Sequence, residues 1–430
     1  MGGLDTIFAT SSGAPPAAIA IVRMSGPAAF AIATAVAGTL PPPRRAAVRA
    51  LHDPRTGVLL DRALVLVFPG PKTATGEDVV EFHVHGGRAV VSAVEAAVGS
   101  QPGARYADPG EFTRRALENG VIDLTAAEGL GDLLSAQTET QRRAALRIAE
   151  GGLRALVDRW TDRLIGVAAN VEAQLDFSDE DDVAAENMGE MVATIGGIVA
   201  EIGHMLSSPP IERLQDGIRV VIAGPPNSGK STLLNAMTGR DVAIVSPISG
   251  TTRDRIEAPV ERAGVAYVLT DTAGLTVTPG DAVEQIGVDR AKAAITSADI
   301  VLWLGDDAPA DPTHLRIHSR IDLPGRSAIP AHSVVGVSAA SGRGVEGLWE
   351  VVAQRAARLL PQEDALTVNR RQRALLGECQ RYLHEATHTG DLLVIAEELR
   401  GALRALDAVA GRSGVEHVLD AVFARFCIGK

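Results

Sequence analysis

Apolar residues in the first 120 positions gather in short runs that end at glycine, a pattern typical of β-strands. The runs are AIAIVRMSG at 18–26, ALVLVFPG at 63–70 and DVVEFHVHGG at 78–87. An Ala-rich segment with helical spacing follows each run. Residues 1–120 therefore predict an N-terminal α+β domain.

The pattern changes at about Asp123, where apolar residues begin to recur at spacings of three and four. This spacing continues to Ser208, where the turn sequence SSPP ends it, and it returns from about Asn369 to the end of the chain. Both stretches predict long helices. We expect them to pack on each other as one bundle, which would bring the end of the chain near its first half.

Residues 217–360 alternate short apolar runs with helical segments, which predicts a mostly parallel sheet with helices on both faces. The runs are IRVVIAG, YVLTDTAG, DIVLWLG and VVGVSA. This α/β domain would be inserted in the bundle. The expected organisation is a multidomain α/β plus all-α chain with domain segments 1–120, 121–213, 214–361 and 362–430.

Composition narrows the class of protein. A chain of 430 residues with 46% apolar content is too long for one core and apolar enough to fold throughout. Its net charge of −12 disfavours binding of nucleic acid by bulk attraction. Two distant cysteines, Cys379 and Cys427, form no disulfide framework, so we expect a cytoplasmic location. No apolar run approaches the roughly 20 residues that span a bilayer, so we expect no membrane span.

The octapeptide GPPNSGKS at 224–231 matches the phosphate-loop pattern G-x-x-x-x-G-K-S, and it stands between strand-like and helix-like segments. The glycines allow the backbone N–H groups to wrap around a polyphosphate. Lys230 would reach the terminal phosphates, and Ser231 would ligate Mg²⁺. The helix that follows directs its positive end at the anion.

Three further segments follow in the order that a GTPase requires. SGTTRD at 249–254 offers Thr252 as a second hydroxyl on the metal, and SAA at 338–340 can frame a base. DTAG at 271–274 offers Asp271 to the outer shell of the metal and the Gly274 N–H to the terminal phosphate. Together these segments resemble a translation-factor-type GTPase, so 214–361 is expected to be a Ras-like P-loop domain.

Two positions depart from the usual GTPase pattern. Leu275 occupies the place of the glutamine that orients water in Ras-like proteins, and it cannot form a hydrogen bond. HSRID replaces N-K-x-D, so that Asp322 survives without the usual asparagine and lysine. Losing a neutral hydrogen bond costs on the order of 1–3 kcal/mol, which predicts guanine binding with loosened selectivity and leaves an ATP-dependent protein as an open alternative. The predicted nucleotide-binding residues are Asn227, Ser228, Gly229, Lys230, Ser231, Thr232, Ser246, Pro247, Ile248, Ser249, Gly250, Thr251, Thr252, Asp271, Thr272, Ala273, Gly274, Ser319, Arg320, Asp322, Ser338, Ala339 and Ala340.

The order of these segments along the whole chain resembles the MnmE family of tRNA-modification GTPases, also called TrmE. Motifs similar to those of the family are GEDVVEFHVHGG at 76–87, PGEFTRRALENG at 109–120, GPPNSGKST, ISGTTRD, DTAGL, DAVEQIG at 281–287 and FCIGK at the end. The resemblance implies a homodimer that binds 5,10-methylene- or 5-formyl-tetrahydrofolate in its N-terminal domain. It also implies a heterotetramer with the flavoprotein MnmG, which adds a carboxymethylaminomethyl-type group at C5 of the wobble uridine of certain tRNAs.

The resemblance implies further roles in the GTPase domain. GTP would be hydrolysed when two such domains meet around K⁺, a cation that can neutralise developing charge as an arginine finger does. Glu284, within DAVEQ, matches the family's water-orienting glutamate, although on sequence alone it reads as a solvated helix-surface carboxylate. The residues that match the K⁺ ligand positions are Asn227, Ser246, Ile248 and Thr251.

The resemblance also implies a folate site and a catalytic thiol. The folate positions are Arg23, Glu81, Val121 and Lys430, where Val121 replaces the lysine of the family's N-G-K and SSGAPPAAIA lacks the family's G-R-G-G. A cation and a carboxylate complement the glutamate tail and pterin ring of a folate. Cys427 would act as nucleophile, acid or base on the uridine or the one-carbon unit, whereas Cys379 reads as a core thiol.

A function from a different class stays open. The chain could be a GTPase switch for ribosome or membrane-surface assembly, with a vestigial folate domain. The departures in the folate motifs favour this alternative, and the ordered motifs of the GTPase domain fit both functions.

Overall fold

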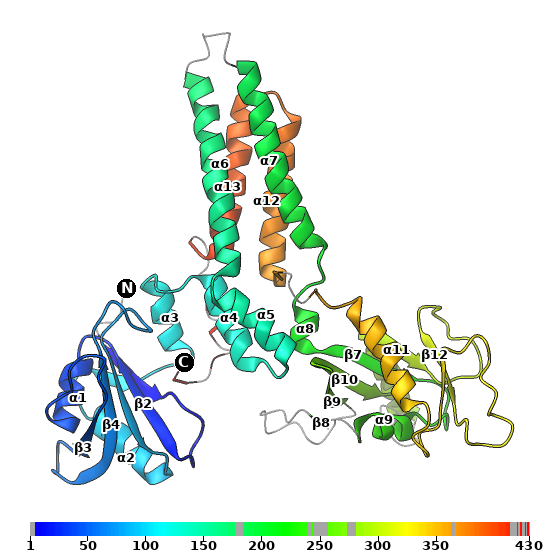
Figure 1. Cartoon of the computed structure of the whole chain (residues 1–430), viewed down its shortest axis with the longest axis horizontal. Helices are drawn as coiled ribbons and strands as arrows, with labels where there is room; N and C mark the ends of the chain where they lie inside the picture. Colours follow the sequence, from blue (N-terminus) through cyan, green and yellow to red (C-terminus); the bar gives the residue numbers. More distant parts are fainter. Residues whose placement is uncertain are drawn as a thin grey trace. The chain divides into compact units, whose positions relative to one another are not determined.

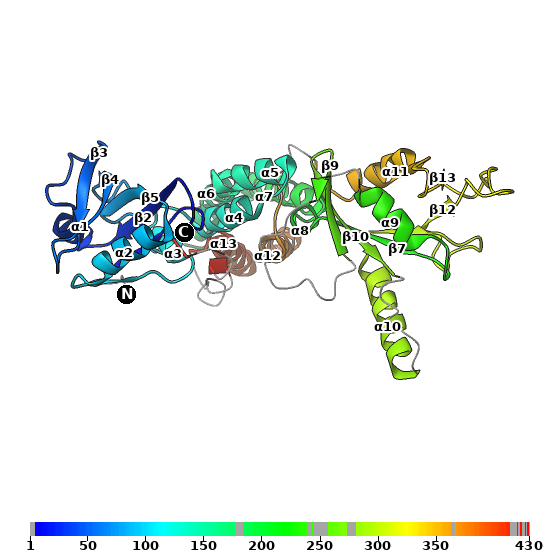
Figure 2. The same cartoon turned by 90° about the horizontal axis from the view of Figure 1, so that it is seen from below.

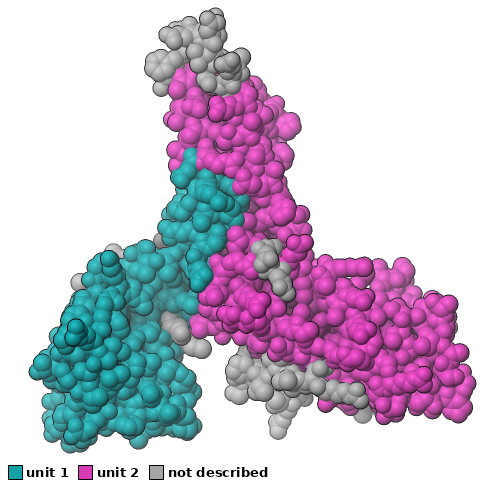
Figure 3. All heavy atoms as spheres, in the orientation of Figure 1, with its two compact units in different colours: residues 1–131, 148–162, 403–430 teal, residues 132–147, 163–402 magenta. Residues whose placement is uncertain are grey.

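The computed structural model describes residues 5–176, 184–239, 242–243, 257–272, 281–362, 366–412, 419, 422–423, 426 and 428–429. The chain divides into two compact units, shown in Figure 3. Unit 1 comprises residues 1–131, 148–162 and 403–430, and unit 2 comprises residues 132–147 and 163–402. The four borders fall within the helices α4 (Leu124–Ser135), α5 (Glu139–Ala149), α6 (Gly152–Asp176) and α13 (Leu392–Ala410).

Unit 1 contains a six-stranded sheet with the order β3-β4-β5-β2-β1-β6. Figure 1 labels its strands β2, β3 and β4. Neighbouring strands are antiparallel, except that β1 and β6 are parallel. The strands are β1 (Thr6–Thr10), β2 (Ile19–Ser25), β3 (Ala47–His52), β4 (Leu59–Phe68), β5 (Val79–His85) and β6 (Ala104–Tyr106). Each of the three predicted runs is a strand. The prediction of a helix after 63–70 was wrong, because β4 returns directly to pair with β5 in antiparallel register.

Helices α1 (Ala29–Ala37) and α2 (Arg88–Gly99) cover one face of this sheet. Val22, Phe82 and Val65 stand opposite one another on β2, β5 and β4 and belong to that core. Successive side chains of a strand point to opposite faces, so Arg23 and Glu81 belong to the other face. Unit 1 also contains α3 (Glu111–Glu118) and α4 (Leu124–Ser135), although α4 continues a few residues past Gly131 into unit 2.

Unit 2 contains a seven-stranded sheet with the order β13-β12-β11-β7-β10-β9-β8. The strands are β7 (Ile218–Ala223), β8 (Val242–Ala243), β9 (Glu257–Arg262), β10 (Val265–Asp271), β11 (Ile300–Trp303), β12 (Leu315–Ser319) and β13 (Val335–Val337). All pairs from β13 to β10 are parallel, and the pairs that include β9 are antiparallel. The predicted mostly parallel sheet is therefore confirmed for the strands that surround β7.

Helices connect and cover these strands. They are α8 (Glu212–Asp216), α9 (Lys230–Thr238), α10 (Asp281–Ser297) and α11 (Val345–Ala357), which appear in Figure 2. Leu233 of α9 and Leu348 of α11 share one core cluster with Val220 and Ile222 of β7. Val221, on the opposite face of β7, is also buried, as expected for a central strand of a parallel sheet.

Helix α7 (Ala184–Ser207) packs against α12 (Arg370–His388), although the whole α/β region separates them in sequence. Asn369 caps α12 by a capping box, in which its side chain accepts from the Gln372 N–H at 2.9 Å and Gln372 accepts from the Asn369 N–H at 3.1 Å. This local chemistry explains why the helical pattern begins at Asn369.

One stretch of the described residues, Met188–Asp216, is long and apolar enough to cross a bilayer, which the sequence analysis did not expect. Ile195, Ile198 and Ile202 are fully buried within this stretch at helical spacing. Because α7 packs on α12, these apolar side chains belong to a protein core. The stretch is therefore not an indication of a membrane span.

A buried amide attaches the helical part of unit 2 to its α/β part. Gln141, in α5 (Glu139–Ala149), donates to the carbonyl oxygens of Leu214 at 2.8 Å and Gln215 at 3.1 Å. Its own carbonyl oxygen accepts from the N–H groups of Gln137 and Thr138 at the start of α5. All four hydrogen-bonding positions of the amide are therefore used. This attachment holds α5 against α8, immediately before β7.

Candidate nucleotide site and chain-end site

The phosphate-loop sequence turns between β7 and α9 by means of three residues with positive φ. Gly224 has φ +145°, Asn227 has φ +57° and Gly229 has φ +97°. A β-carbon on Gly224 would lie 3.2 Å from the Leu304 nitrogen. Glycine supplies these conformations at low cost, and asparagine is among the residues that tolerate the left-handed region. The motif glycines are thus required by the path of the main chain.

The phosphate side of the site carries an ammonium, a hydroxyl and a carboxylate. Lys230 donates to the carbonyl oxygens of Gly224 at 3.0 Å and Pro225 at 2.9 Å. Burial lowers the pKa of Lys230, an effect that the nearby Asp271 carboxylate opposes. The Ser231 hydroxyl donates to the buried Asp271 carboxylate. This set at the N-terminus of α9 suits a polyphosphate and a hard divalent cation such as Mg²⁺.

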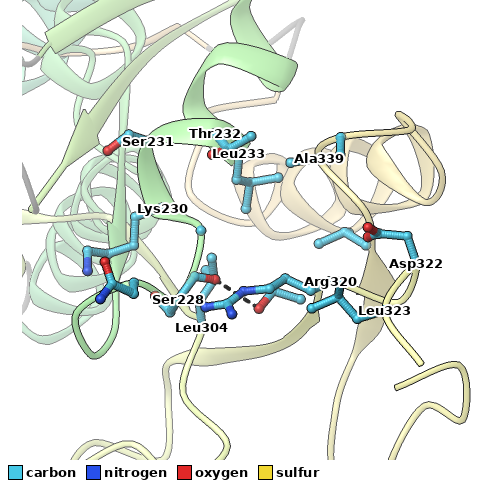
Figure 4. Close-up of a pocket in the computed structure, with 15 residues that line it drawn as sticks. Ser228, Lys230, Ser231, Thr232, Leu233, Leu304, Arg320, Asp322, Leu323 and Ala339 are labelled. Atoms are coloured by element: carbon cyan, nitrogen blue, oxygen red, sulfur yellow. Dashed lines mark hydrogen bonds between the residues drawn. The ribbon is translucent and has the colours of Figure 1, made fainter. Parts of the chain in front are cut away.

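A cavity of about 480 Å³ extends from these groups towards the loops after β12 and β13 (Figure 4). The Ser319 hydroxyl donates to the Ser228 carbonyl oxygen at 3.0 Å. Asp322 lies at the far end of the cavity, and a hydrogen bond from the Ser338 hydroxyl holds the pKa of Asp322 below its usual range. Asp322 is therefore an ionised acceptor at neutral pH, suited to a ring N–H and an exocyclic amine.

The structure gathers most of the described nucleotide candidates around this cavity. Those that line it are Asn227, Ser228, Gly229, Lys230, Ser231, Thr232, Ser319, Arg320, Asp322, Ala339 and Ala340. Asp271 contacts Ser231, the Thr272 hydroxyl donates to the Ile222 carbonyl at 3.0 Å, and Ser338 is fully buried beside Asp322. Residues 246–252 and 273–274 lie outside the described residues, and with them the candidate ligands Ser246, Ile248, Thr251 and Thr252.

The sequence analysis missed four apolar residues that line the cavity: Leu233, Leu304, Leu323 and Val337. Leu304 directly follows β11, and Val337 ends β13. The carboxyl ends of neighbouring parallel strands meet at one edge of a sheet, which is where ligands bind in open α/β folds. Applied to the run DIVLWLG, that rule would have predicted Leu304 as a residue of the ligand site.

Other candidates are only partly described. Glu284 lies in α10, but the structure describes its backbone alone. Cys427 and Lys430 lie outside the described residues, so their side chains have no structural account here. Their described neighbours, Phe426, Ile428 and Gly429, belong to unit 1.

The last described residues of the chain pack against its first strand and α3. A β-carbon on Gly429 would lie 2.2 Å from the Thr10 carbonyl oxygen and 3.0 Å from the Ser11 α-carbon. Gly429 also has φ +98°. The Phe423 ring lies 5.7 Å from the guanidinium of Arg114, on α3. Main chain thus meets main chain at Gly429, and only glycine fits there.

Two of the predicted folate residues form a pair on the face of the unit 1 sheet opposite α1 and α2, where Phe112 of α3 packs on Ile7 and Ala9. Arg23 and Glu81 stand opposite each other on β2 and β5 and form an ion pair at 2.9 Å. The His83 ring contacts the other oxygen of Glu81 at 3.1 Å, and the Arg23 guanidinium lies 5.8 Å from the Phe112 ring. Val121 is 43% exposed and lies against Gly76. A carboxylate and a guanidinium beside an aromatic ring suit a polar heterocycle.

The chain is similar to characterised families over nearly its full length. Residues 6–121 match the family described as GTP-binding protein TrmE N-terminus, and residues 124–427 match the MnmE helical domain. A tRNA modification GTPase MnmE of Rhizorhabdus wittichii is 54% identical and covers 99% of this chain and 97% of the relative. The corresponding protein of Erythrobacter litoralis is 50% identical and covers 99% and 100%. The solved G domain of the T. maritima FeoB iron transporter is 24% identical over 32% of this chain and 98% of its own, with a TM-score of 0.25.

Cys379 is a buried core thiol, so its reactivity can be predicted. Burial raises the pKa of Cys379 to about 12, so that roughly one thiol in ten thousand is ionised at pH 8. In a Cys427→Ser variant, we expect iodoacetamide at pH 8 to leave Cys379 unmodified in the folded protein and to modify it in urea. Intact-mass spectrometry measures the labelling, and rapid modification of the folded variant would contradict burial of this thiol.

Proposed function

The chain belongs to the MnmE family of tRNA modification GTPases, and from that premise we propose that it hydrolyses GTP in the unit 2 cavity to drive modification of tRNA. The observation that supports this best is the combination, around one cavity, of a phosphate loop, an ionised Asp322 and the Ser231–Asp271 contact. An adenine base offers no pair of donors to Asp322, whereas guanine offers its N1–H and its exocyclic amine. GTP is therefore the favoured substrate.

The phosphates would lie over the N-terminus of α9. Lys230, which donates to two loop carbonyls, would exchange these contacts for the terminal phosphates. Ser231 and Thr252 would hold Mg²⁺, with Asp271 in its outer shell, and the metal would neutralise charge on the phosphates. Ser319, Arg320 and the backbone of residues 338–340 would surround the base.

Hydrolysis would use groups that follow from the family resemblance. K⁺ would be bound by Asn227, Ser246, Ile248 and Thr251, and it would stabilise charge that develops in the transition state. Glu284 would orient the attacking water, because Leu275 cannot. Asn227, at positive φ in the phosphate loop, is the described member of this group.

We assign tRNA modification to the segments 1–120 and 362–430, which flank the helical 121–213 and GTPase 214–361 segments; residues 1–120 and 403–430 belong to unit 1. Arg23 and Glu81, with Val121 and Lys430, would hold a 5,10-methylene- or 5-formyl-tetrahydrofolate, which supplies a one-carbon unit. Cys427 would act on C5 of the wobble uridine or on the one-carbon unit. The packing of Gly429 on Thr10, one strand away from Arg23, supports this assignment.

A homodimer is proposed through the exposed part of the unit 1 sheet face that carries Glu81, at β2, β3 and β4. Ile19, Val48 and Leu64 are 59%, 62% and 36% exposed. The strand registers pair Val48 with Leu64, Leu64 with His83 and Ile19 with His85, so all of them share the face of Glu81. An exposed apolar face rimmed by polar residues is typical of an interface. The further partners are MnmG, as a heterotetramer, and tRNA, in the cytoplasm.

A GTPase switch with a vestigial folate domain is the alternative. Val121 offers no cation at a folate position and is 43% exposed, which is the observation that favours it. The Cys427 prediction below distinguishes the two functions, because a switch would not need the thiol.

GTP turnover is expected to be at least about ten-fold faster in KCl than in NaCl of equal ionic strength, because a cation beside the phosphates stabilises the transition state. The Asn227→Ala variant should lose most of this difference while it still binds a fluorescent GDP analogue. Phosphate release measures the rates. Equal wild-type rates in the two salts would remove K⁺ from the mechanism.

Glu284→Gln is expected to slow GTP hydrolysis by roughly 100-fold, because a neutral amide orients water less well than a carboxylate. The affinity for GDP should stay within about two-fold of wild type. Asp289→Asn, on the same helix, is the matched control and should keep the wild-type rate. A Glu284→Gln enzyme with normal turnover would exclude this residue as the water-orienting group.

Cys427→Ser is expected to abolish wobble-uridine modification and to leave GTP turnover within about two-fold of wild type, because a serine hydroxyl is a poor substitute for a thiol, whether the thiol acts as nucleophile, acid or base. Nucleoside analysis of tRNA from a complemented deletion strain measures the first quantity, with Cys379→Ala as control. Normal modified nucleosides in the Cys427→Ser strain would instead favour the switch.

A further inference from the structure

The loop that carries Asp322 is attached to each neighbouring loop of the cavity. The Ser319 hydroxyl donates to the Ser228 carbonyl of the phosphate loop at 3.0 Å, and both residues are buried. The Ile321 N–H donates to the Val337 carbonyl at 3.3 Å, at the end of β13. The short Ser319 side chain thus makes a direct connection between the base side and the phosphate side of the site.

Arg326 lies in the same loop and connects it to the loop after β11. Its Nε donates to the Ser319 carbonyl oxygen at 3.1 Å, and its two terminal nitrogens donate to the two carboxylate oxygens of Asp306 at 3.0 and 2.7 Å. The Arg326 carbonyl oxygen contacts the ring of buried His318 at 2.9 Å. A planar guanidinium fits this fork geometry, which a lysine ammonium cannot reproduce.

Asp306 lies in the loop after β11, and two hydrogen bonds hold this loop in place. The Trp303 indole N–H donates to the Asp307 carbonyl at 3.0 Å, and the Leu304 N–H donates to the Ala223 carbonyl at 2.8 Å, next to the phosphate loop. Arg326 therefore links the loops that follow β11 and β12, the two strands adjacent in the sheet. The Asp306–Arg326 pair is partly exposed, so it contributes little to the free energy of folding. Its effect is to fix the position of one loop relative to the other.

We propose that Arg326 is a positioning residue for base recognition, which holds Ser319 and Asp322 in register with the nucleotide through Asp306. This brace compensates for the absent asparagine and lysine of the usual N-K-x-D pattern. The proposal rests on the proposed GTP function, and it predicts that Arg326 affects discrimination between bases and not general phosphate binding. Arg326 lies outside the cavity lining, so its effect must pass through the loop.

The test measures dissociation constants of the full chain for GDP, IDP and ADP. IDP lacks the exocyclic amine that Asp322 would accept from. For Arg326→Met we expect GDP binding to weaken by about ten-fold, IDP by about three-fold and ADP not at all, because GDP loses two hydrogen bonds to Asp322, IDP loses only the one from its N1–H, and ADP makes neither. Arg326→Lys should be intermediate. Asp306→Ala should reproduce the Arg326→Met profile, and the double variant should be no weaker than either single variant.

Three outcomes separate the possibilities. Wild-type protein that binds GDP and ADP equally would overturn the guanine assignment itself, whatever Arg326 does. Wild-type preference for GDP with an unchanged GDP-to-IDP ratio in Arg326→Met and Asp306→Ala would overturn the proposal. Equal weakening of all three nucleotides would also overturn it, because it would indicate a merely structural role. Arg358→Met, at an exposed arginine of the same domain, should match wild type.

Asp306→Ala keeps the test decisive if Arg326→Met fails to fold, because the Asp306 side chain is 71% exposed and its removal leaves no buried partner behind.

Discussion

The nucleotide site depends on the path of the main chain between β7 and α9. Positive φ at Gly224, Asn227 and Gly229 turns the loop so that α9 begins at Lys230. The same turn directs the buried Ser228 carbonyl towards Ser319, from whose hydroxyl it accepts a hydrogen bond. Phosphate recognition and base recognition thus share one backbone conformation. A change in the loop would displace Asp322 as well as Lys230.

The second constraint is the close approach of the chain end to β1. Gly429 and Gly110 both have positive φ, and both contact main chain in unit 1, at Thr10 and Phe423 respectively. No side chain can be placed between these segments. The glycine of the terminal C-x-G-K sequence therefore has a steric reason, independent of any chemistry by its neighbours. The contact gives Gly429 a defined location, which residues near a chain terminus often lack.

Local sequence pattern predicted those elements whose cores are continuous and apolar. The runs at β2, β5, β7, β10 and β11 were recognised because each consists mostly of apolar residues, and most of these residues are buried; the short β1 is also buried but was missed. Strands at or next to a sheet edge, such as β3 and β9, were missed, since β3 buries only Leu51 and β9 only Val260. The helix predicted after β4 was wrong for a different reason. The pattern of one strand does not reveal whether the next strand pairs with it directly, in antiparallel direction, or after a crossover helix, in parallel direction.

The sequence by itself determined the phosphate loop, the helix start at Asn369 and the family, because each depends on residue types at fixed short spacing. Only the tertiary structure decided that Ser319 meets Ser228, that Arg326 meets Asp306 and that Gly429 meets Thr10. Ser319 and Ser228 are 91 residues apart. Contacts of this kind follow from strand order and register in the sheets, which bring loops together irrespective of their distance along the chain.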